Sequence, residues 1–328
     1  MQAFVVDAPG DPSVLSLRTV PDPEPAPGWV VIEIAAFGLN RAEAVTRAGG
    51  SGAAVAFPRI IGIECVGTVV DAGGTDLAPG QRVAAAMGGM GRSYDGSYAE
   101  LTRVPRATVF PVTTELDWVT FAALPETFFT AWGCLAATDS LTGTPRVLMR
   151  PGASALGLAV AQIVNHLGGE VVGVTRSDHK RAALLEGGMA DVVVSAGAVE
   201  AEVRRRWPEG ATAVIDTVAS DDSLTDGLAL LVEGGTLCVA GSLAESYATA
   251  PHASVRTVFE REDVTFYSSE SLNADTDTTT LQQVVDRVDG GVYRPGVAEV
   301  IAFGELPEAH RRMEANAYAG KVVVDLSG

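Results

Sequence analysis

Cysteine, histidine and positive charge are all scarce in this chain of 328 residues. Its three cysteines, Cys65, Cys134 and Cys238, lie far apart and form no C-x-x-C pair, so the sequence predicts a reducing compartment and no disulfide framework. The 41 acidic residues outnumber 23 basic ones, and the net charge of −18 argues against nucleic acid or an anionic membrane as a partner. A phosphate ligand is not excluded, because backbone amides and one or two nearby basic side chains are enough to hold it.

Long apolar runs are also missing. No stretch approaches the roughly 20 apolar residues of a membrane-spanning helix. The first residues, M-Q-A-F-V, begin an alternating strand pattern and do not resemble a targeting segment. We therefore expect a cytoplasmic protein.

The pattern of the chain changes near residue 118. Before that point, short strands at 29–36, 67–71 and 82–86 are separated by glycine and proline, which predicts an antiparallel, barrel-like region. After it, apolar strands alternate with helices, which predicts an α/β fold with a parallel, doubly wound sheet. The predicted domains are residues 1–117 with 271–328, and residues 118–270. The helices expected in the second half are 120–137, 153–167, 178–186 and 281–288, and the strands are 146–149, 171–175, 191–194, 213–216, 235–240, 264–268, 297–303 and 321–326.

A glycine-containing turn follows the strand at 146–149 and opens a helix. Compared with the G-x-G-x-x-G fingerprint, Gly152 and Gly157 hold the first and third places, and Ser154 holds the middle one. Gly152 suits a tight turn and Gly157 close helix–strand packing, while the amides and dipole of the helix start suit a pyrophosphate. The small Ser154 offers a hydroxyl that could itself bond phosphate. The alternative is a purely structural turn.

The end of the next strand indicates which dinucleotide fits. An NAD site places Asp or Glu about 20 residues after the first glycine, to bind the ribose 2′-hydroxyl. Here Thr175 ends the strand, and Arg176, Ser177 and Lys180 follow it. Arginine grips a 2′-phosphate through paired hydrogen bonds and lysine adds charge, so this pattern favours NADPH. The alternative is a solvated helix start with Ser177 as its N-cap.

Five segments, in order along the chain, resemble the zinc-independent quinone oxidoreductases of the medium-chain dehydrogenase/reductase superfamily. Residues 38–49 (G-L-N-R-A-E…R-A-G) resemble their G-x-N-x-x-D…R-x-G segment. Residues 61–69 (I-G-I-E-C-V-G-T-V) are similar to their G-x-E-x-x-G-x-V strand, and residues 95–100 (D-G-S-Y-A-E) to G-x-Y-A-E. Residues 124–132 (L-P-E-T-F-F-T-A-W) resemble the helix beneath the nicotinamide, and residues 316–324 the closing N…G-K-V-V.

The resemblance implies a GroES-like β-barrel catalytic domain, made from both ends of the chain, around a Rossmann domain. It places Asn40 and Thr130 at the nicotinamide, as catalytic and cofactor-binding candidates. The remaining cofactor-binding candidates are Gly152, Ser154, Ala155, Leu156, Gly157, Thr175, Arg176, Ser177 and Lys180 for the phosphates and ribose, Gly241, Ser242 and Leu243 beside the nicotinamide ring, and Asn316. A homodimer through the strand at 263–268 is also implied, because pairing of this edge with its twin extends the sheet.

Zinc-bearing relatives place a histidine where this chain has Ile63, and the four histidines of this chain stand elsewhere without ligand spacing. We therefore expect no metal site, and we expect Glu64 to pair with a basic neighbour. Without a metal, a conjugated enone or a quinone is the easier hydride acceptor. Asn40 is a candidate donor to the oxyanion and Tyr94 a candidate proton donor, while Val45 stands where many relatives have tyrosine.

The function predicted is hydride transfer from NADPH to an α,β-unsaturated carbonyl or a quinone. Two alternatives stay open. One is a tailoring enzyme of natural-product biosynthesis, which carries out enoyl reduction or reductive cyclisation. The other is an NADPH-binding protein whose catalytic pocket has decayed, for which Ser154 and Val45 are the motivating departures.

Overall fold

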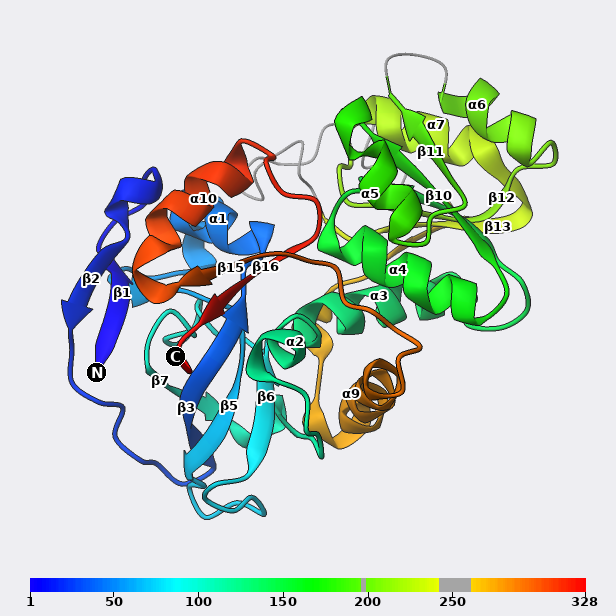
Figure 1. The fold of residues 1–328 in the computed structure, drawn as a ribbon. Helices are drawn as coiled ribbons and strands as arrows, with labels where there is room; N and C mark the ends of the chain where they lie inside the picture. The colour runs from blue at the N-terminus through cyan, green and yellow to red at the C-terminus, as the bar shows by residue number, and fades with distance from the viewer. Residues whose placement is uncertain (196–198, 242–260) are drawn as a thin grey trace. The chain divides into compact units, whose positions relative to one another are not determined.

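The chain forms two compact units (Figure 1) in the computed structural model, which describes residues 1–195, 199–241 and 261–328. One unit comprises residues 1–126 with 269–328, and the other comprises residues 127–268. These divisions lie near the predicted boundaries at 117 and 270. The first boundary falls later because helix α2 (Trp118–Ala122) packs on strands of the first unit.

The first unit is built mainly from antiparallel strands. Its larger sheet has the order β15-β16-β3-β5-β6-β8, with β7 also paired to β3, and its smaller sheet has the order β2-β1-β4. Only β15 and β16 run parallel within it. The strands are β1 (Gln2–Val6), β2 (Ser16–Thr19), β3 (Trp29–Gly38), β4 (Arg59–Ile60), β5 (Glu64–Asp71), β6 (Arg82–Ala86), β7 (Leu101–Pro105), β8 (Val109–Pro111), β15 (Val297–Ala302) and β16 (Lys321–Asp325).

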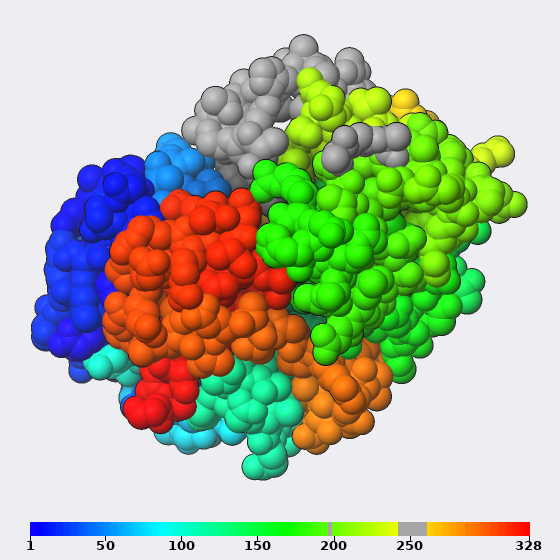
Figure 2. Space-filling view, turned by 45° about the horizontal axis from the view of Figure 1, so that its top comes forward, coloured from blue at the N-terminus to red at the C-terminus, as the bar shows by residue number. Residues whose placement is uncertain are grey.

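Four longer helices complete the first unit: α1 (Arg41–Arg47), α2, α9 (Ala274–Asp289) and α10 (Leu306–Glu314). Short 3-10 turns occur at η1 (Pro12–Val14), η2 (Gly52–Ala54), η3 (Arg106–Thr108), η5 (Ser269–Ser271) and η6 (Phe303–Glu305). The N-terminal and C-terminal segments lie side by side on the surface (Figure 2), where η1 contacts α10. Both ends of the chain therefore contribute to one unit.

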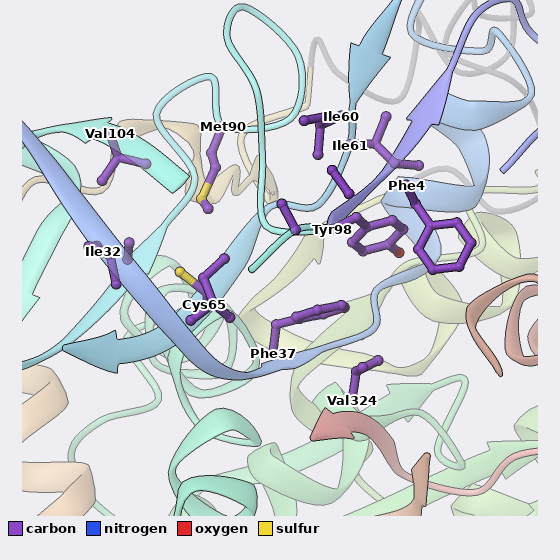
Figure 3. Packing of buried hydrophobic residues seen from close by; sticks show 14 of the residues in the cluster. Phe4, Ile32, Phe37, Ile60, Ile61, Cys65, Met90, Tyr98, Val104 and Val324 are labelled. Carbon is purple, nitrogen blue, oxygen red and sulfur yellow. The ribbon is translucent and has the colours of Figure 1, made fainter. Parts of the chain in front are cut away.

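A hydrophobic cluster fills the interior of the first unit, with aromatic rings among its aliphatic side chains (Figure 3). The ring of Phe37, on β3, stacks on that of Tyr98 with 5.2 Å between centroids, and Phe4 meets Phe303 edge to face at 5.1 Å. Tyr98 has no exposed surface. A buried phenol must have a hydrogen-bond partner, so this packing requires polar groups inside the barrel.

The second unit contains a parallel six-stranded sheet with the order β11-β10-β9-β12-β13-β14, the doubly wound arrangement predicted. Its strands are β9 (Arg146–Arg150), β10 (Glu170–Thr175), β11 (Asp191–Val194), β12 (Ala211–Asp216), β13 (Leu231–Val239) and β14 (Val264–Phe266). Its helices are α4 (Ala155–His166), η4 (Asp178–Lys180), α5 (Arg181–Glu186), α6 (Val199–Arg206) and α7 (Asp221–Leu230), together with most of α3 (Pro125–Ala137).

Proline explains one wrong prediction. The single helix predicted over residues 120–137 is two helices, α2 and α3, and the second begins at Pro125. Proline is well suited to the start of a helix, where its missing amide hydrogen costs nothing. The helix predicted over 281–288 also starts earlier, at Ala274, with Asn273 as an N-cap that accepts from the amide of Asp275.

Two remaining expectations concern membranes and thiols. None of the helices that the structure describes has the length and apolar character needed to span a membrane. Cys65, Cys134 and Cys238 are all free and buried. They belong to the hydrophobic interior of the two units.

Candidate active site

The turn from β9 into α4 has no room for side chains at its two glycines. A Cβ on Gly152 would lie 2.7 Å from the Cα of Gly173 on β10, and a Cβ on Gly157 would lie 2.4 Å from the carbonyl oxygen of Gly152. Ser154, between them, has φ −79° and ψ 159°, an extended conformation open to any residue. The backbone of the turn therefore requires glycine at two of the three fingerprint positions and tolerates serine at the third.

Ser154 uses its hydroxyl within the turn. The Oγ atom accepts from the amide of Gly157 at 3.0 Å and donates to the carbonyl oxygen of Pro151 at 2.9 Å. Its hydrogen is thus engaged within the turn, and the predicted contact of this hydroxyl with a phosphate remains a prediction. The first-turn amides of Ala155 and Leu156 have no acceptor within helix α4. These two amides, at the positive end of the helix dipole, are the groups suited to a phosphate.

An exposed arginine follows β10. Thr175 is buried at the strand end, and its Oγ1 accepts from the amide of Ser177 at 3.2 Å. Ser177 stands at the N-cap position of η4 without a capping side-chain hydrogen bond, so the simple capping interpretation fails. Arg176 is exposed and forms no ion pair with any residue that the structure describes, and Lys180 is buried. An exposed guanidinium without a carboxylate partner suits an anionic ligand.

The structure says less about the remaining cofactor-binding candidates of the second unit. Thr130 lies on α3 with 7% of its surface exposed. Gly241 follows β13, and a Cβ there would lie 3.3 Å from the carbonyl oxygen of Thr217. Ser242 and Leu243 lie outside the described residues. The predicted roles of these four residues remain predictions.

Asn40 lies in a tight polar cluster inside the first unit, between the end of β3 and the start of α1. Its Oδ1 accepts from the Nζ of Lys321 at 2.7 Å, and its Nδ2 donates to Oε1 of Glu64 at 2.8 Å. Lys321 also donates to the same carboxylate oxygen at 2.6 Å. Oε2 of Glu64 accepts from the amide of Glu126 at 2.9 Å. We call Asn40, Glu64 and Lys321 the lysine triad.

The lysine triad is buried except at Asn40. The side chains of Lys321 and Glu64 are 2% and 1% exposed, whereas Asn40 is half-buried. Gly38 makes the space for the ion pair, because a Cβ there would lie 2.1 Å from Cε of Lys321 and 2.7 Å from Oε1 of Glu64. The expected pairing of Glu64 with a basic neighbour is confirmed.

These residues do not fit a zinc ion at Glu64. Ile63 offers no ligand atom, and both oxygens of Glu64 already accept hydrogen bonds. The ammonium of Lys321 also lies where it would repel a nearby cation. Within the described part of the chain, no group of three or more His, Cys, Asp or Glu side chains is placed to hold a metal.

A second buried network begins beside the lysine triad. Glu43, fully buried on α1, accepts from the amides of Asn40 at 2.8 Å and Ile63 at 3.0 Å and from the hydroxyl of Tyr98 at 2.7 Å. Burial raises the pKa of Glu43 from 4.5 to about 7, against the lowering effect of these three donors. We call Glu43, Tyr98, His310 and Arg47 the glutamate network.

The direction of each hydrogen bond in the glutamate network follows from Arg47. Arginine only donates, so its contact of 3.5 Å makes Nδ1 of His310 an acceptor. Nε2 of His310 then carries the hydrogen and donates to Tyr98 at 2.8 Å, and Tyr98 donates to Glu43. Burial, followed by the charge of Arg47, lowers the pKa of His310 to about 3, which keeps the ring neutral. Arg47 also pairs with Glu314 on the surface side.

The remaining candidates of the first unit lie in different surroundings. The ring of Tyr94 meets Trp29 edge to face at 5.2 Å, its hydroxyl lies 3.4 Å from the carbonyl oxygen of Met87, and burial raises its pKa to about 12. It lines a cavity of about 240 Å³ together with Trp29, Arg59 and Arg103. No contact joins Tyr94 to the lysine triad. Asn316 is exposed in a left-handed conformation, φ 56°, and accepts from Arg41 at 2.8 Å.

Sequence reasoning missed Lys321, Glu43 and His310 as members of polar clusters. One signal was present: Lys321 opens the apolar strand K-V-V-V, where a charged residue needs a buried partner. The positions of Glu43 and His310 carry no comparable signal, because a charged or polar residue on a short helix is ordinarily solvated.

Comparisons with known proteins agree with this architecture. Residues 26–114 match the family described as alcohol dehydrogenase GroES-like domain, and residues 155–289 match zinc-binding dehydrogenase. The quinone oxidoreductase of Lama guanicoe is 25% identical over 331 residues, covering 99% of this chain and 97% of its own. A polyketide synthase of Streptomyces halstedii, GfsB, is 27% identical over 272 residues, which cover 81% of this chain and 5% of the synthase. The structure of the Escherichia coli quinone oxidoreductase complexed with NADPH is similar in fold, with a TM-score of 0.87, 19% identity, and coverage of 99% of this chain and 100% of that one.

Proposed function

Because the chain belongs to the medium-chain dehydrogenase/reductase superfamily, we propose that it transfers hydride from NADPH to a conjugated enone or a quinone. When bound, the reduced nicotinamide supplies the hydride. The residues of this chain bind and orient the two reactants and stabilise the charge that develops on the acceptor. Quinone oxidoreductases of similar length are among the relatives of this chain, which supports this choice.

The proposal that the chain binds NADPH is based on residues of the second unit. The amides of Ala155 and Leu156 suit a pyrophosphate, since they lie at the start of a helix of 12 residues and have no acceptor within that helix. Arg176, exposed after β10, suits the 2′-phosphate that distinguishes NADPH from NADH. The E. coli quinone oxidoreductase, which is similar in fold, binds NADPH in its crystal structure.

The proposed class of hydride acceptor is based on the lysine triad, and this is the observation that carries the proposal. The cation that contacts Asn40 is a lysine ammonium of the chain itself, and the neighbouring Glu64 carboxylate already accepts three hydrogen bonds. In the lysine triad, the group suited to polarise a substrate oxygen is the N–H of the Asn40 amide. An acceptor that spreads its negative charge over a conjugated system needs less stabilisation than a simple ketone. Enones and quinones meet this condition, and we propose that the enzyme works without zinc.

A second candidate has specific support. Similarity to a segment of a polyketide synthase favours reduction of an enoyl intermediate in natural-product biosynthesis. The chemistry is the same hydride addition to a conjugated carbonyl, so the two candidates differ only in the substrate. A panel that includes enoyl thioesters separates them from small enones and quinones.

The first experiment compares the affinities for NADPH and NADH by fluorescence titration of the wild type and Arg176→Ala. We expect tighter NADPH binding, an NADPH affinity reduced about tenfold or more in Arg176→Ala, and little change for NADH. Arg205→Ala is the matched control, because Arg205 is an exposed arginine of the same unit, 73% exposed on α6. Equal affinity for both nucleotides would overturn the NADPH assignment. Binding of neither would favour a decayed cofactor site.

The second experiment follows NADPH oxidation with quinones, enones, enoyl thioesters and saturated ketones. We expect turnover with at least one conjugated class and none with saturated ketones. Turnover with saturated ketones alone would refute the proposed acceptor class. Tight NADPH binding without turnover on any conjugated acceptor would instead support the decayed-pocket alternative.

A further inference from the structure

The lysine triad fixes the side-chain amide of Asn40 in one of its two orientations. With Oδ1 toward Lys321 and Nδ2 toward Glu64, both contacts are favourable, at 2.7 and 2.8 Å. A rotation of the amide by 180° would place N–H groups against the ammonium and an oxygen against the carboxylate. Both interactions would then be repulsive, in an interior where such interactions are strong.

One hydrogen of the Asn40 amide remains weakly held. The nearest other acceptors of Nδ2 are the carbonyl oxygen of Gly38 at 3.4 Å and Oε1 of Glu43 at 3.5 Å. Both distances lie beyond the usual range of N–H···O hydrogen bonds, about 2.7 to 3.2 Å. This N–H is therefore available to an acceptor with better geometry.

The charge of Lys321 also strengthens this donor. An ammonium that donates to the amide oxygen draws electron density from the amide nitrogen, which makes its remaining N–H a better hydrogen-bond donor. Glu64 compensates the buried positive charge, so the cluster remains close to neutral overall. Because Asn40 is the only member of the triad that is not fully buried, it is the member that can meet a substrate.

We propose that Lys321 is a positioning residue that, with Glu64, fixes and polarises the Asn40 amide so that its weakly held N–H donates to the carbonyl oxygen of the hydride acceptor. The inference rests on the proposed function for its substrate and on the triad for its geometry. As hydride reaches the β-carbon of the enone, the C=C π electrons move toward the carbonyl and its oxygen becomes an enolate oxygen. The Asn40 N–H stabilises that oxygen, and a proton from solvent completes the reduction.

The test separates this role from simple charge neutralisation. Lys321→Met alone leaves a buried unpaired carboxylate and is expected to fold poorly, so the informative variant is Lys321→Met with Glu64→Gln. This double variant removes both charges and leaves near-isosteric neutral side chains. We expect its NADPH affinity to stay within about twofold of the wild type, because the groups proposed to hold the pyrophosphate and the 2′-phosphate lie in the other unit. With an accepted enone we expect kcat to fall about tenfold or more and KM to change little.

The matched control is Arg312→Met with Glu299→Gln. It removes an ion pair of 2.9 Å from the same unit, at side chains that are 36% and 34% exposed. We expect this control to keep the wild-type kcat. A folded lysine-triad double variant with wild-type kcat would overturn the proposal, because Lys321 would then serve only to neutralise Glu64.

A second readout does not depend on turnover. The chain has four asparagines, Asn40, Asn165, Asn273 and Asn316, so selective ¹⁵N labelling gives a simple spectrum of side-chain amides. The Asn40 signal is assigned by its loss in Asn40→Asp. We expect it to be sharp and shifted downfield in the wild type, and to move toward the ordinary amide position and broaden in the double variant. An unchanged Asn40 signal would refute the positioning role. If this signal changes as expected but no conjugated acceptor is reduced, the proposed function fails and the triad geometry stands.

Discussion

Glu43 is a buried carboxyl group whose titration is expected to affect the stability of the first unit. In the unfolded chain it should ionise with its ordinary pKa of 4.5, whereas burial raises its pKa to about 7 in the folded protein. The contribution of Glu43 to stability is therefore fully present below pH 4.5, where it is protonated in both states. It is lost as the pH rises toward 7, because the unfolded state gains more from ionisation than the folded state does.

The size of this effect follows from the difference between the two pKa values. At about 1.4 kcal/mol for each pH unit, the full loss is about 3 kcal/mol, and most of it falls between pH 5 and pH 8. Glu43→Gln cannot ionise and removes this dependence. It also places an amide group among three donors, from Asn40, Ile63 and Tyr98, which adds a destabilisation that does not vary with pH.

The measurement is urea unfolding of the wild type and Glu43→Gln at pH 5 and pH 8. The difference in free energy of unfolding, wild type minus variant, should fall by about 2 to 3 kcal/mol between the two conditions. Glu33→Gln is the control, because Glu33 is an exposed carboxylate of the same unit, on β3, and its difference should stay constant. A Glu43→Gln difference that is equal at pH 5 and pH 8 would show that Glu43 ionises normally and would refute the reasoning.

Three further predictions concern other parts of the molecule. Ser154→Ala should lower stability by about 1 kcal/mol, because the cap on the Gly157 amide is lost, and should leave NADPH affinity within about twofold by titration. Gly38→Ala should displace Lys321, because its Cβ would overlap the lysine side chain, and should therefore lower both the melting temperature and the kcat for NADPH oxidation. Wild-type values for both would show that the ion pair does not need a glycine at this position. The edge strand β14, with Phe266 55% exposed, should mediate a homodimer. Light scattering should find a dimer for the wild type and a larger monomer fraction for a charged substitution of Phe266, whereas a monomeric wild type at micromolar concentration would count against the dimer.

The overall architecture was predictable because it depends on repeated local patterns. Strands β6 and β11 have the predicted bounds, since each is a short apolar run flanked by turn residues. The fingerprint turn was likewise predictable, because Gly152 and Gly157 are required by the close approach of backbone atoms. These features depend only on residues that are close in sequence, or on the alternation of strands and helices that is typical of a parallel sheet.

The polar clusters were not predictable by the same means. Lys321 and Asn40 are 281 positions apart, and Tyr98 and His310 are 212 apart. Their partners are determined by which strands and helices meet in the folded first unit, not by spacing along the chain. The hydrogen bonds of the Ser154 hydroxyl to Gly157 and Pro151 were not predictable for a related reason, because they depend on the detailed shape of the turn.

Asn40 connects the two clusters, and this connection has a consequence for the pH dependence of catalysis. Its side chain belongs to the lysine triad, while its backbone amide donates to Glu43 of the glutamate network. Protonation of Glu43 weakens that backbone hydrogen bond, because a neutral carboxyl accepts less strongly than a carboxylate. The start of α1, which positions Asn40, is then held less tightly. If Asn40 assists hydride transfer, kcat should fall as the pH drops below about 7, and in Glu43→Gln this dependence should disappear at a lower, constant kcat. A pH profile with the same midpoint in both proteins would assign the dependence to another group.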